Sequence, residues 1–391
     1  GFCLGVCSGF AIPVAQKFGE KNEKALRRFV ANSAWLAVLF SAVMTVAVCL
    51  LCRNILELMQ TPEDIIDGAY SYIFVIFLGI PATYLYNLLS CTIRSLGDST
   101  TPLIFLVFSS VVNVALDFFT ILVLKMGVSG AAWATLTAVS GILCLFYMRK
   151  KFDILKMNDD EWRPDAHYMK ILCNMGIPMG LQYSITAIGS VILQTAVNSL
   201  GSMAVAAVTA GSKISMFFCC PFDALGSTMA TYGGQNVGAR KLDRIDQGLK
   251  AGAVMGCVYA VIAFAVLCIF GQWIALMFVD KGEGEILRNT RLFLIGNSLF
   301  YIPLVFVNAV RFMIQGLGYS RLAIIAGVCE MAARSFVGFC LVPVFGYIAV
   351  CIASPVAWIA ADLFLIPAYR HVMKNLNQLF YGRSRATDAA Q

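Results

Sequence analysis

Runs of about 20 predominantly apolar residues recur along the whole length of this 391-residue chain. A helical run of that length is sufficient to cross the ~30 Å hydrocarbon core of a bilayer. The chain is 59% hydrophobic and 13% charged, with a mean hydropathy of +0.78, whereas soluble domains carry about 25% charged residues. The sequence therefore predicts an all-α polytopic membrane protein.

Eleven membrane spans are predicted by reading the apolar runs between turn and charge signals. The predicted spans cover residues 1–18, 29–52, 67–93, 101–124, 127–148, 171–197, 203–234, 248–279, 286–315, 322–344 and 346–369. An odd number of spans puts the two ends of the chain on opposite sides of the membrane.

Lys and Arg are divided unevenly between the connections on the two sides. One side receives 22 of them, Arg311 included, and the other side receives five. Connections rich in Lys and Arg stay in the cytoplasm, so the richer side and the C-terminus are predicted to be cytoplasmic. The basic residues are not interleaved with aromatic side chains, as a nucleic-acid surface would require. We therefore attribute the net charge of +7 to the basic connections that set the orientation of the protein in the membrane.

Two pairs of motifs recur in the same order along the chain. The sequence "AQKFGE" at 15–20 matches "GQNVGA" at 234–239, an offset of 219, and "IRSLGDS" at 93–99 matches "IQGLGYS" at 314–320, an offset of 221. The dipeptide "IP" at 80–81 also matches "IP" at 302–303. Both copies of the first motif end on the cytoplasmic side, so we predict two halves repeated in parallel, each with an even number of spans.

The odd span count and the parallel repeat together predict a missing N-terminal part. Through the offset of 219, Gly1 corresponds to Cys220, so the first half lacks a counterpart for residues 168–219. The chain also starts without Met and inside an apolar run. We expect about 50 further residues before Gly1, with one full span, and twelve spans in the intact protein.

The one long polar connection separates the two halves. The predicted domains are an N-terminal lobe at 1–148, a cytoplasmic linker at 149–170, a C-terminal lobe at 171–370 and a cytoplasmic tail at 371–391.

Cysteines and histidines give no sign of a disulfide framework or a metal centre. Nearly all of the 14 cysteines lie inside apolar runs, where a free thiol acts as a small hydrophobic side chain. His167 and His371 both lie at segment ends. We find no nucleophile and base, and no His-rich cluster, of the kind an enzyme would need, so no enzymatic activity and no cofactor are expected.

Asn113 and Asp117 lie four residues apart in the apolar run "VVNVALDFFTILVL" at 111–124. A carboxylate at this depth costs about 2.5 to 3.5 kcal/mol on insertion scales, so Asp117 should face the protein interior and be neutralised by a proton, a cation or a partner. Asn113 lies one helical turn earlier on the same face, and Thr135 on the next span can bring a hydroxyl to it. The alternative is that the pair only hydrogen-bonds a neighbouring helix.

A second i, i+4 pair, Glu330 and Arg334, lies in the C-terminal half. Glu before Arg is the favourable order on a helix, so the pair can neutralise itself as a buried ion pair. A role in cation recognition or gating is the alternative, with Gln182 as a further polar group of the same lobe.

The chain resembles the multidrug and toxic compound extrusion (MATE) family. The resemblance rests on the two helix ends "AQKFGE" and "GQNVGAR", the turns "IRSLGDSTTP" and "IQGLGYS", "NVALD" at 113–117, "GVSGAAWAT" at 127–135, "PMGLQYSI" at 178–185 and "CEMAAR" at 329–334. It covers essentially the whole chain, and the order of these motifs across a duplicated set of spans makes it specific.

The resemblance implies two six-helix lobes that form a V-shaped cleft in the cell membrane. Such proteins export amphipathic, often cationic compounds in exchange for H⁺ or Na⁺, without a cofactor, and we expect a monomer. The rival with a related fold is a flippase for lipid-linked oligosaccharides or peptidoglycan precursors, whose cavity should be strongly cationic.

The resemblance also implies a cation or proton site in the first lobe. It is made from an Asn and an Asp at i, i+4, a Thr on the sixth helix and an Asp on the first helix. Asn113, Asp117 and Thr135 match by position, while the first-helix Asp would precede Gly1. Tyr72 fits a tyrosine often found near this pocket, with Tyr70 as a competitor. Some relatives carry a Glu on the seventh helix, but 176–197 contains Gln182 and Gln194 and no acid.

Overall fold

The computed structural model describes residues 1–58, 66–122, 130–280 and 282–388, and it is helical with no strand in these ranges. The side chains of 58, 116, 117, 119–122, 130–137 and 382–388 lie outside the description. The prediction of an all-α polytopic protein is confirmed. The chain forms two compact units, Cys3–Ile177 (the first unit) and Pro178–Gln391 with Gly1–Phe2 (the second unit).

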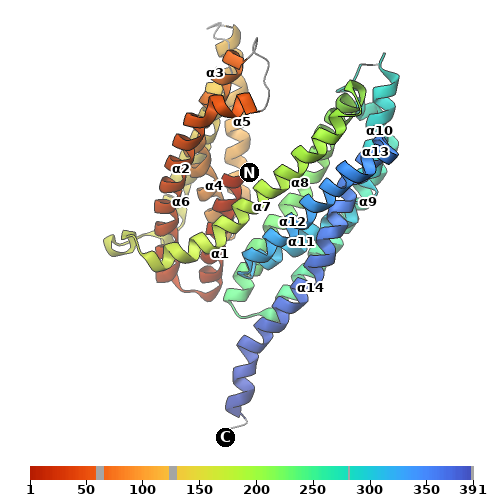
Figure 1. Ribbon diagram of the computed structural model, residues 1–391. Coiled ribbons are helices and arrows are strands. Elements are labelled where there is room, and N and C mark those ends of the chain that lie inside the picture. Colours follow the sequence, from red (N-terminus) through yellow and green to blue (C-terminus); the bar gives the residue numbers. More distant parts are fainter. Residues whose placement is uncertain (59–65, 123–129, 281, 389–391) are drawn as a thin grey trace. The chain divides into compact units, whose positions relative to one another are not determined.

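The helices of both units are labelled in Figure 1. Most of the first unit consists of α1 (Phe2–Glu20), α2 (Glu23–Leu58), α3 (Ile66–Leu78), α4 (Ile80–Ser95), α5 (Thr100–Leu122), α6 (Gly130–Lys151) and the short helices η1 (Asp153–Leu155) and η2 (Asp159–Trp162). Helix α7 (Ala166–Asn198) continues from the first unit into the second. The rest of the second unit comprises α8 (Ser202–Gly238), α9 (Leu242–Ala275), α10 (Gly284–Ser298), α11 (Tyr301–Gly316), α12 (Ser320–Phe336), the π-helical segment η3 (Val337–Leu341), α13 (Val342–Phe345) and α14 (Tyr347–Asp388).

Within the described ranges, eight helical segments are long and apolar enough to cross a membrane. The pair α10 and α11, bent by 50°, would make a ninth, and Thr100–Ala115 is a shorter apolar helix. Pro303 lies in the first turn of α11, as Pro81 does in α4. Proline interrupts the backbone hydrogen bonding of a long helix, which accounts for broken helices at the two matching "IP" sites.

The first pair of repeated motifs ends both helices in the same way. Lys21 after α1 and Arg240 after α8, 219 residues apart, have φ values of 59° and 55°, and no other non-glycine residue of the described ranges has a positive φ. The amide of the next residue closes the turn in both copies: Asn22 N donates to Lys17 O over 3.0 Å and Lys241 N donates to Asn236 O over 2.9 Å. The two helix ends therefore match in backbone conformation and in the hydrogen bond that closes the turn.

The second pair of motifs also ends its helices alike. Gly97 after α4 and Gly318 after α11 have φ values of 94° and 99°. Their amides donate to Arg94 O and Gln315 O, each over 2.9 Å. Glycine adopts this left-handed conformation without the steric cost that a Cβ brings, which explains the glycine in both "LG" turns.

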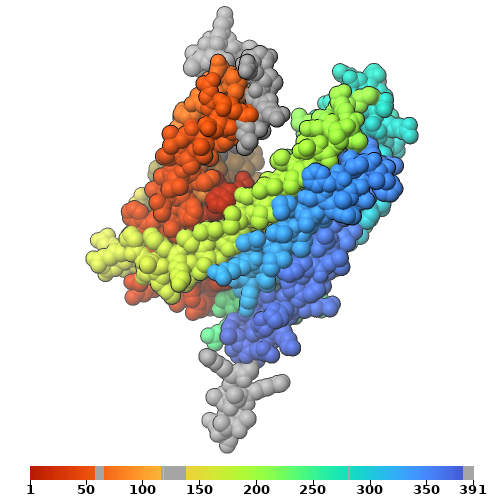
Figure 2. Space-filling model, in the orientation of Figure 1, coloured from red at the N-terminus to blue at the C-terminus, as the bar shows by residue number. Residues whose placement is uncertain are grey.

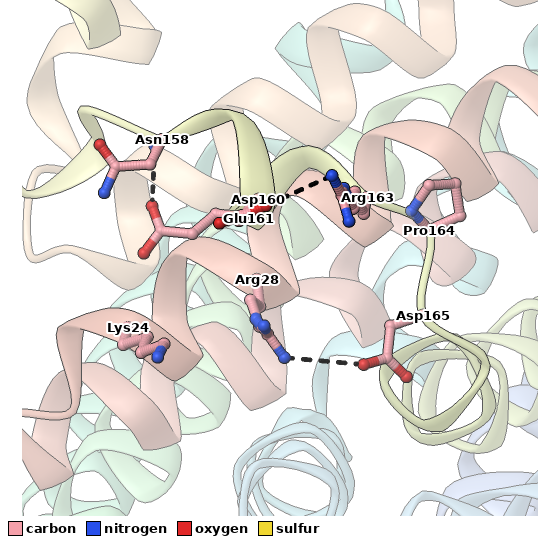
Figure 3. Close-up of a pocket in the computed structure, with 8 residues that line it drawn as sticks. All are labelled: Lys24, Arg28, Asn158, Asp160, Glu161, Arg163, Pro164 and Asp165. Carbon is pink, nitrogen blue, oxygen red and sulfur yellow. Dashed lines mark hydrogen bonds and ion pairs between the residues drawn. The ribbon is translucent and has the colours of Figure 1, made fainter.

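The linker between the predicted lobes is folded onto α2. Glu161 of η2 is 5% exposed, Arg27 Nε donates to its two carboxylate oxygens over 2.9 and 2.8 Å, and the Asn158 amide donates to Oε2 over 3.0 Å. The Asp165 amide donates to Asn32 Oδ1 over 2.9 Å, and Figure 3 shows the Arg28–Asp165 ion pair beside it. The 410 Å³ hollow drawn there is lined by paired charges of both signs.

The larger core cluster of the second unit comes mainly from α8, α9, α11 and α14. Phe222 packs edge-on against Tyr259 and Tyr301, and Tyr301 lies beside Trp358. Glycines let α8 approach α10 and α11 closely, since a Cβ on Gly211 or Gly226 would collide with a phenylalanine ring. Helix α14 runs on to Asp388, so the first part of the predicted tail at 371–391 is helical.

Candidate functional site

A buried charged cluster joins α11 and α12 in the second unit. Arg311 Nη1 donates to Glu330 Oε1 over 2.8 Å, and Arg334 Nη2 lies 3.7 Å from Glu330 Oε2. The three side chains are 7%, 3% and 9% exposed. One carboxylate therefore serves two guanidinium groups, which is the arrangement that makes burial of these charges tolerable.

A polar stripe on α11 positions this cluster. Asn308, Arg311 and Gln315 follow one another at the three- and four-residue spacing of a single helix face, and all three are buried. Gln315 Nε2 donates to Gln182 Oε1 of α7 over 2.8 Å. The cluster thus continues from α12 through α11 to α7, and Arg334 Nη1 extends it to the Thr186 carbonyl oxygen over 3.3 Å.

Asp362 of α14 is the second acid of this region. It is 9% exposed and interacts electrostatically with Arg311 and Glu330. Three buried atoms here have no hydrogen-bond partner among the described residues, namely Arg311 Nε, Gln315 Oε1 and Asp362 Oδ1. Unmet polar atoms of this kind cost free energy and are rare in folded proteins, so the cluster has capacity for further polar ligands or water.

Sequence reasoning found Glu330, Arg334 and Gln182 but not Arg311 or Gln315. The prediction that Arg311 belongs to a cytoplasmic connection is wrong, because the residue lies within α11, is 6% exposed and pairs with Glu330. The signal was available in the Asn308, Arg311 and Gln315 spacing, which predicts one polar helix face. The polar face is hard to recognise in the sequence because it lies at the end of α11, next to the "LG" turn, where polar residues usually belong to a connection.

The predicted site of the first unit is described only in part. Asn113 on α5 is half-buried and Tyr72 on α3 is 37% exposed. The side chains of Asp117 and Thr135 lie outside the described residues, although their backbones belong to α5 and α6. Helix α6 packs against both α5 and α3, so the helices that carry these four residues are neighbours.

The repeat relates the polar positions of the two units. Gly97 and Gly318 differ by 221 in number, and the same offset takes Asn113 to Arg334 and Asp117 to Gly338. Gly338 belongs to η3, the π-helical segment at Val337–Leu341. Such widened turns are frequent at functional sites. Helix α5 and its counterpart, α12 with η3, therefore each have a polar or irregular feature at this level.

An acidic residue at the end of α4 is held by several donors. Asp98 accepts bonds from Thr101 Oγ1 over 2.8 Å and Tyr147 OH over 2.5 Å, and Lys151 Nζ lies 3.5 Å away. Burial raises the pKa of this carboxyl, but the bonds from Tyr147 and Thr101 and the charge of Lys151 outweigh it and lower the pKa to about 2. Asp98 also accepts from the Thr100 and Thr101 amides, which caps α5.

No group of three or more His, Cys, Asp and Glu within the described residues is placed to hold a metal ion. Asp117 is not among these residues, because its side chain lies outside the description. The observations define a duplicated, polytopic helical membrane protein with ionisable side chains buried in its spans, the class to which secondary transporters belong.

The family follows from comparison with known sequences. A family model described as MatE matches residues 1–119 and 178–340. The chain therefore belongs to the MatE family.

Individual relatives agree with this. The chain is 27% identical to the probable multidrug resistance protein YoeA of Bacillus subtilis over 291 residues, 72% of this chain and 63% of YoeA. It is 28% identical to the probable multidrug resistance protein YpnP of the same organism, over 79% of this chain and 69% of YpnP. It is also 22% identical to an FAD transporter of Shewanella oneidensis over 70% of this chain and 62% of that protein. The match thus spans less than two thirds of YoeA.

Solved structures confirm the fold. An outward-facing MATE family transporter of the MOP superfamily superposes with a TM-score of 0.89 at 18% identity, over 96% of this chain and 85% of that one. A MOP superfamily transporter from Pyrococcus furiosus, described as having a binding pocket of reverse polarity, gives 0.85 at 18% identity over 97% and 85%.

Proposed function

We propose that this chain belongs to a secondary antiporter that exports amphipathic, cationic compounds across the cell membrane in exchange for H⁺ or Na⁺. Membership of the MatE family and the relatives described as multidrug resistance proteins support this. The proposed protein acts by alternating access, needs no cofactor, works as a monomer and has its C-terminus in the cytoplasm.

The Asn113 and Asp117 pair carries the proposal. Both lie in α5, within a run that contains no other ionisable residue between Asp98 and Lys125. An acid in such a helix is most stable when a proton or a cation neutralises it. Binding of the coupling ion at Asp117, with Asn113, Thr135 and Tyr72 nearby, therefore provides a reason for one lobe conformation to be favoured over the other.

The inward movement of one coupled ion releases enough free energy to drive export of the substrate. A charge that moves down ~150 mV releases about 3.5 kcal/mol, at ~2.3 kcal/mol per 100 mV. At ~1.4 kcal/mol per tenfold, this sustains a substrate gradient of about 300-fold.

In the second unit, we propose that Glu330, Arg334 and Gln182 mainly hold α7, α11 and α12 together. Two arginines and two acids, Glu330 and Asp362, lie in one region. A flippase for pyrophosphate-linked lipids needs a strongly cationic cavity, and this mixed cluster does not favour that alternative.

The test is transport by the full-length protein in proteoliposomes loaded with a cationic fluorescent dye. Asp117→Asn should stop dye export driven by either a pH or a Na⁺ gradient, because the neutral side chain cannot change charge when an ion binds. Asp159→Asn on the exposed linker is the matched control and should transport normally. Separate pH and Na⁺ gradients identify the ion, and normal export by Asp117→Asn would refute the proposal.

A further inference from the structure

A groove of about 1000 Å³ lies within the first unit, between α2, α4 and α6. The linker closes one end of it through Phe152, Leu155 and Trp162. It lies apart from Asn113 and Tyr72, neither of which lines it.

The groove has the depth of one leaflet of a bilayer. Its lining runs from Val30 to Ser41 on α2 and from Pro81 to Thr92 on α4. Eleven residues at a rise of 1.5 Å make about 16 Å, which is about half of the ~30 Å hydrocarbon core. The groove therefore extends from the linker end to roughly the middle of the membrane.

The walls of the groove are apolar. Alanine, valine and leucine side chains dominate on α2 and α4. The serine and threonine hydroxyls of the lining are bonded to their own helices, since Ser33 donates to Val30 O, Ser41 to Val38 O and Thr92 to Leu88 O. Tyr84 also belongs to the lining, and its buried hydroxyl has no partner among the described residues. Because the other three hydroxyls have no hydrogen left to donate and most of the wall is aliphatic, the groove suits a hydrocarbon chain better than a polar solute.

The linker end of the groove is basic and aromatic. Arg149 of α6 and Lys156 are exposed and line it. Arg149 makes no ion pair within the described part of the chain, and Lys156 pairs only with the exposed Asp153, an interaction of little strength in water. Trp162 is 46% exposed, and its carbonyl oxygen accepts a 2.9 Å bond from Trp35 of α2. Half-exposed tryptophans are typical of the interface between membrane and water.

The side chains of α2 beside the groove are apolar and exposed. Helix α2 lies on the surface that Figure 2 shows, in orange-red. The exposed members include Val38, Leu39 and Val43, at 64%, 58% and 58%. A molecule dissolved in the bilayer can therefore reach the groove sideways from the membrane.

We propose that this groove binds an anionic phospholipid of the leaflet on the basic, cytoplasmic side. The headgroup phosphate pairs with Arg149 and Lys156 beside Trp162, and an acyl chain lies along α2 and α4. Basic pockets between spans at this depth recognise acidic headgroups in other membrane proteins. A lipid fits the groove better than a soluble phosphate does, because the walls are apolar and the groove is about as deep as one leaflet.

Native mass spectrometry of the full chain in mild detergent tests this assignment without measuring transport. The probes are dioleoylphosphatidylglycerol and dioleoylphosphatidylcholine, which differ in headgroup charge but not in acyl chains. Wild-type protein should retain the anionic lipid preferentially. The variant Arg149→Gln with Lys156→Gln should weaken its binding about 30-fold, which corresponds to about 2 kcal/mol for two basic residues.

Two matched controls separate this site from general effects. Lys150→Gln with Arg163→Gln removes the same charge from exposed residues of the same segment that do not line the groove, and it should leave retention unchanged. Ala34→Phe fills the groove and should lower occupancy by both lipids, whereas Ala47→Phe, exposed on the same helix, should not.

Equal retention of the two lipids by wild-type protein would overturn the proposal, as would equal losses in the two charge-removal variants. A photoreactive acyl chain gives an independent measurement. It should label peptides that contain Leu85 or Leu145 of the groove, and labelling confined to α9 or α14 would also overturn the assignment.

Discussion

Arg311 and Glu330 form a direct hydrogen bond of 2.8 Å between α11 and α12, with both side chains more than nine-tenths buried. Arg334 approaches the other oxygen of the same carboxylate. Because a single acid is shared, its removal has a larger effect than the loss of either arginine.

Glu330→Gln should destabilise the protein by about 3 kcal/mol or more. The substitution leaves two buried guanidinium groups without their carboxylate, and an unpaired buried charge is costly. Thermal unfolding followed by fluorescence-detected size exclusion measures the effect. Replacing Glu330, Arg311 and Arg334 together by Met should recover much of the loss, since apolar residues of similar volume can substitute for a buried ion cluster. A Glu330→Gln protein as stable as wild type would contradict the shared role.

Glu161→Gln should release the linker from α2 and cost about 1 to 3 kcal/mol. The buried carboxylate receives the Arg27 bonds and the Asn158 amide, and a neutral amide replaces the charged acceptor. Hydrogen exchange of 153–165 should rise several-fold. Asp160→Asn, whose partner Arg163 is exposed, is the control and should leave exchange unchanged; equal exchange in the two variants would show that Glu161 does not hold the linker.

Asp98→Asn should lower stability at neutral pH and have no effect in strong acid. A carboxyl whose folded pKa is depressed stabilises the fold above its unfolded pKa of 3.8, and the contribution is lost as pH falls towards about 2. We expect about 1 kcal/mol at pH 7, less than the full shift in pKa implies, because Asp98 keeps some contact with solvent. Unfolding midpoints of both proteins between pH 7 and pH 2 should converge below pH 4. A difference as large at pH 2 as at pH 7 would exclude an ionic origin.

Gly97→Ala and Gly318→Ala should each cost about 1 to 2 kcal/mol. A Cβ at Gly97 meets no atom within 4 Å, so the cost there comes from the left-handed backbone and not from crowding, and Gly318 has the same backbone conformation. Gly271→Ala is the control, because its Cβ is also unobstructed but it lies within α9. That substitution should be neutral or stabilising, and a similar loss for all three in thermal unfolding would rule out the backbone explanation.

The helical class and the repeat could be predicted from sequence because both depend on local patterns. Apolar runs and the two "LG" turns occur within short segments, and the structure reproduces them with matching φ values at Gly97 and Gly318. The number of spans in the whole protein stays a prediction.

The charged cluster could not be predicted in full because it depends on contacts between distant helices. The spacing of Glu330 and Arg334 indicated an ion pair within α12, but the shorter bond comes from Arg311, 19 residues away on α11. The linker is a similar case, since Glu161 meets Arg27 across 134 residues. Neither pairing leaves a signal in a single sequence window.

The π-helical turn at Val337–Leu341 fixes which way the rest of its span faces. A widened turn accommodates one more residue than an α-helical one, and one residue corresponds to about 100° of rotation around the axis. Closing this turn to α-helical geometry without removing a residue would therefore rotate Val342 and its neighbours by about that angle relative to Glu330 and Arg334. The geometry of this one turn sets the angular register between the charged cluster and the far end of the helix.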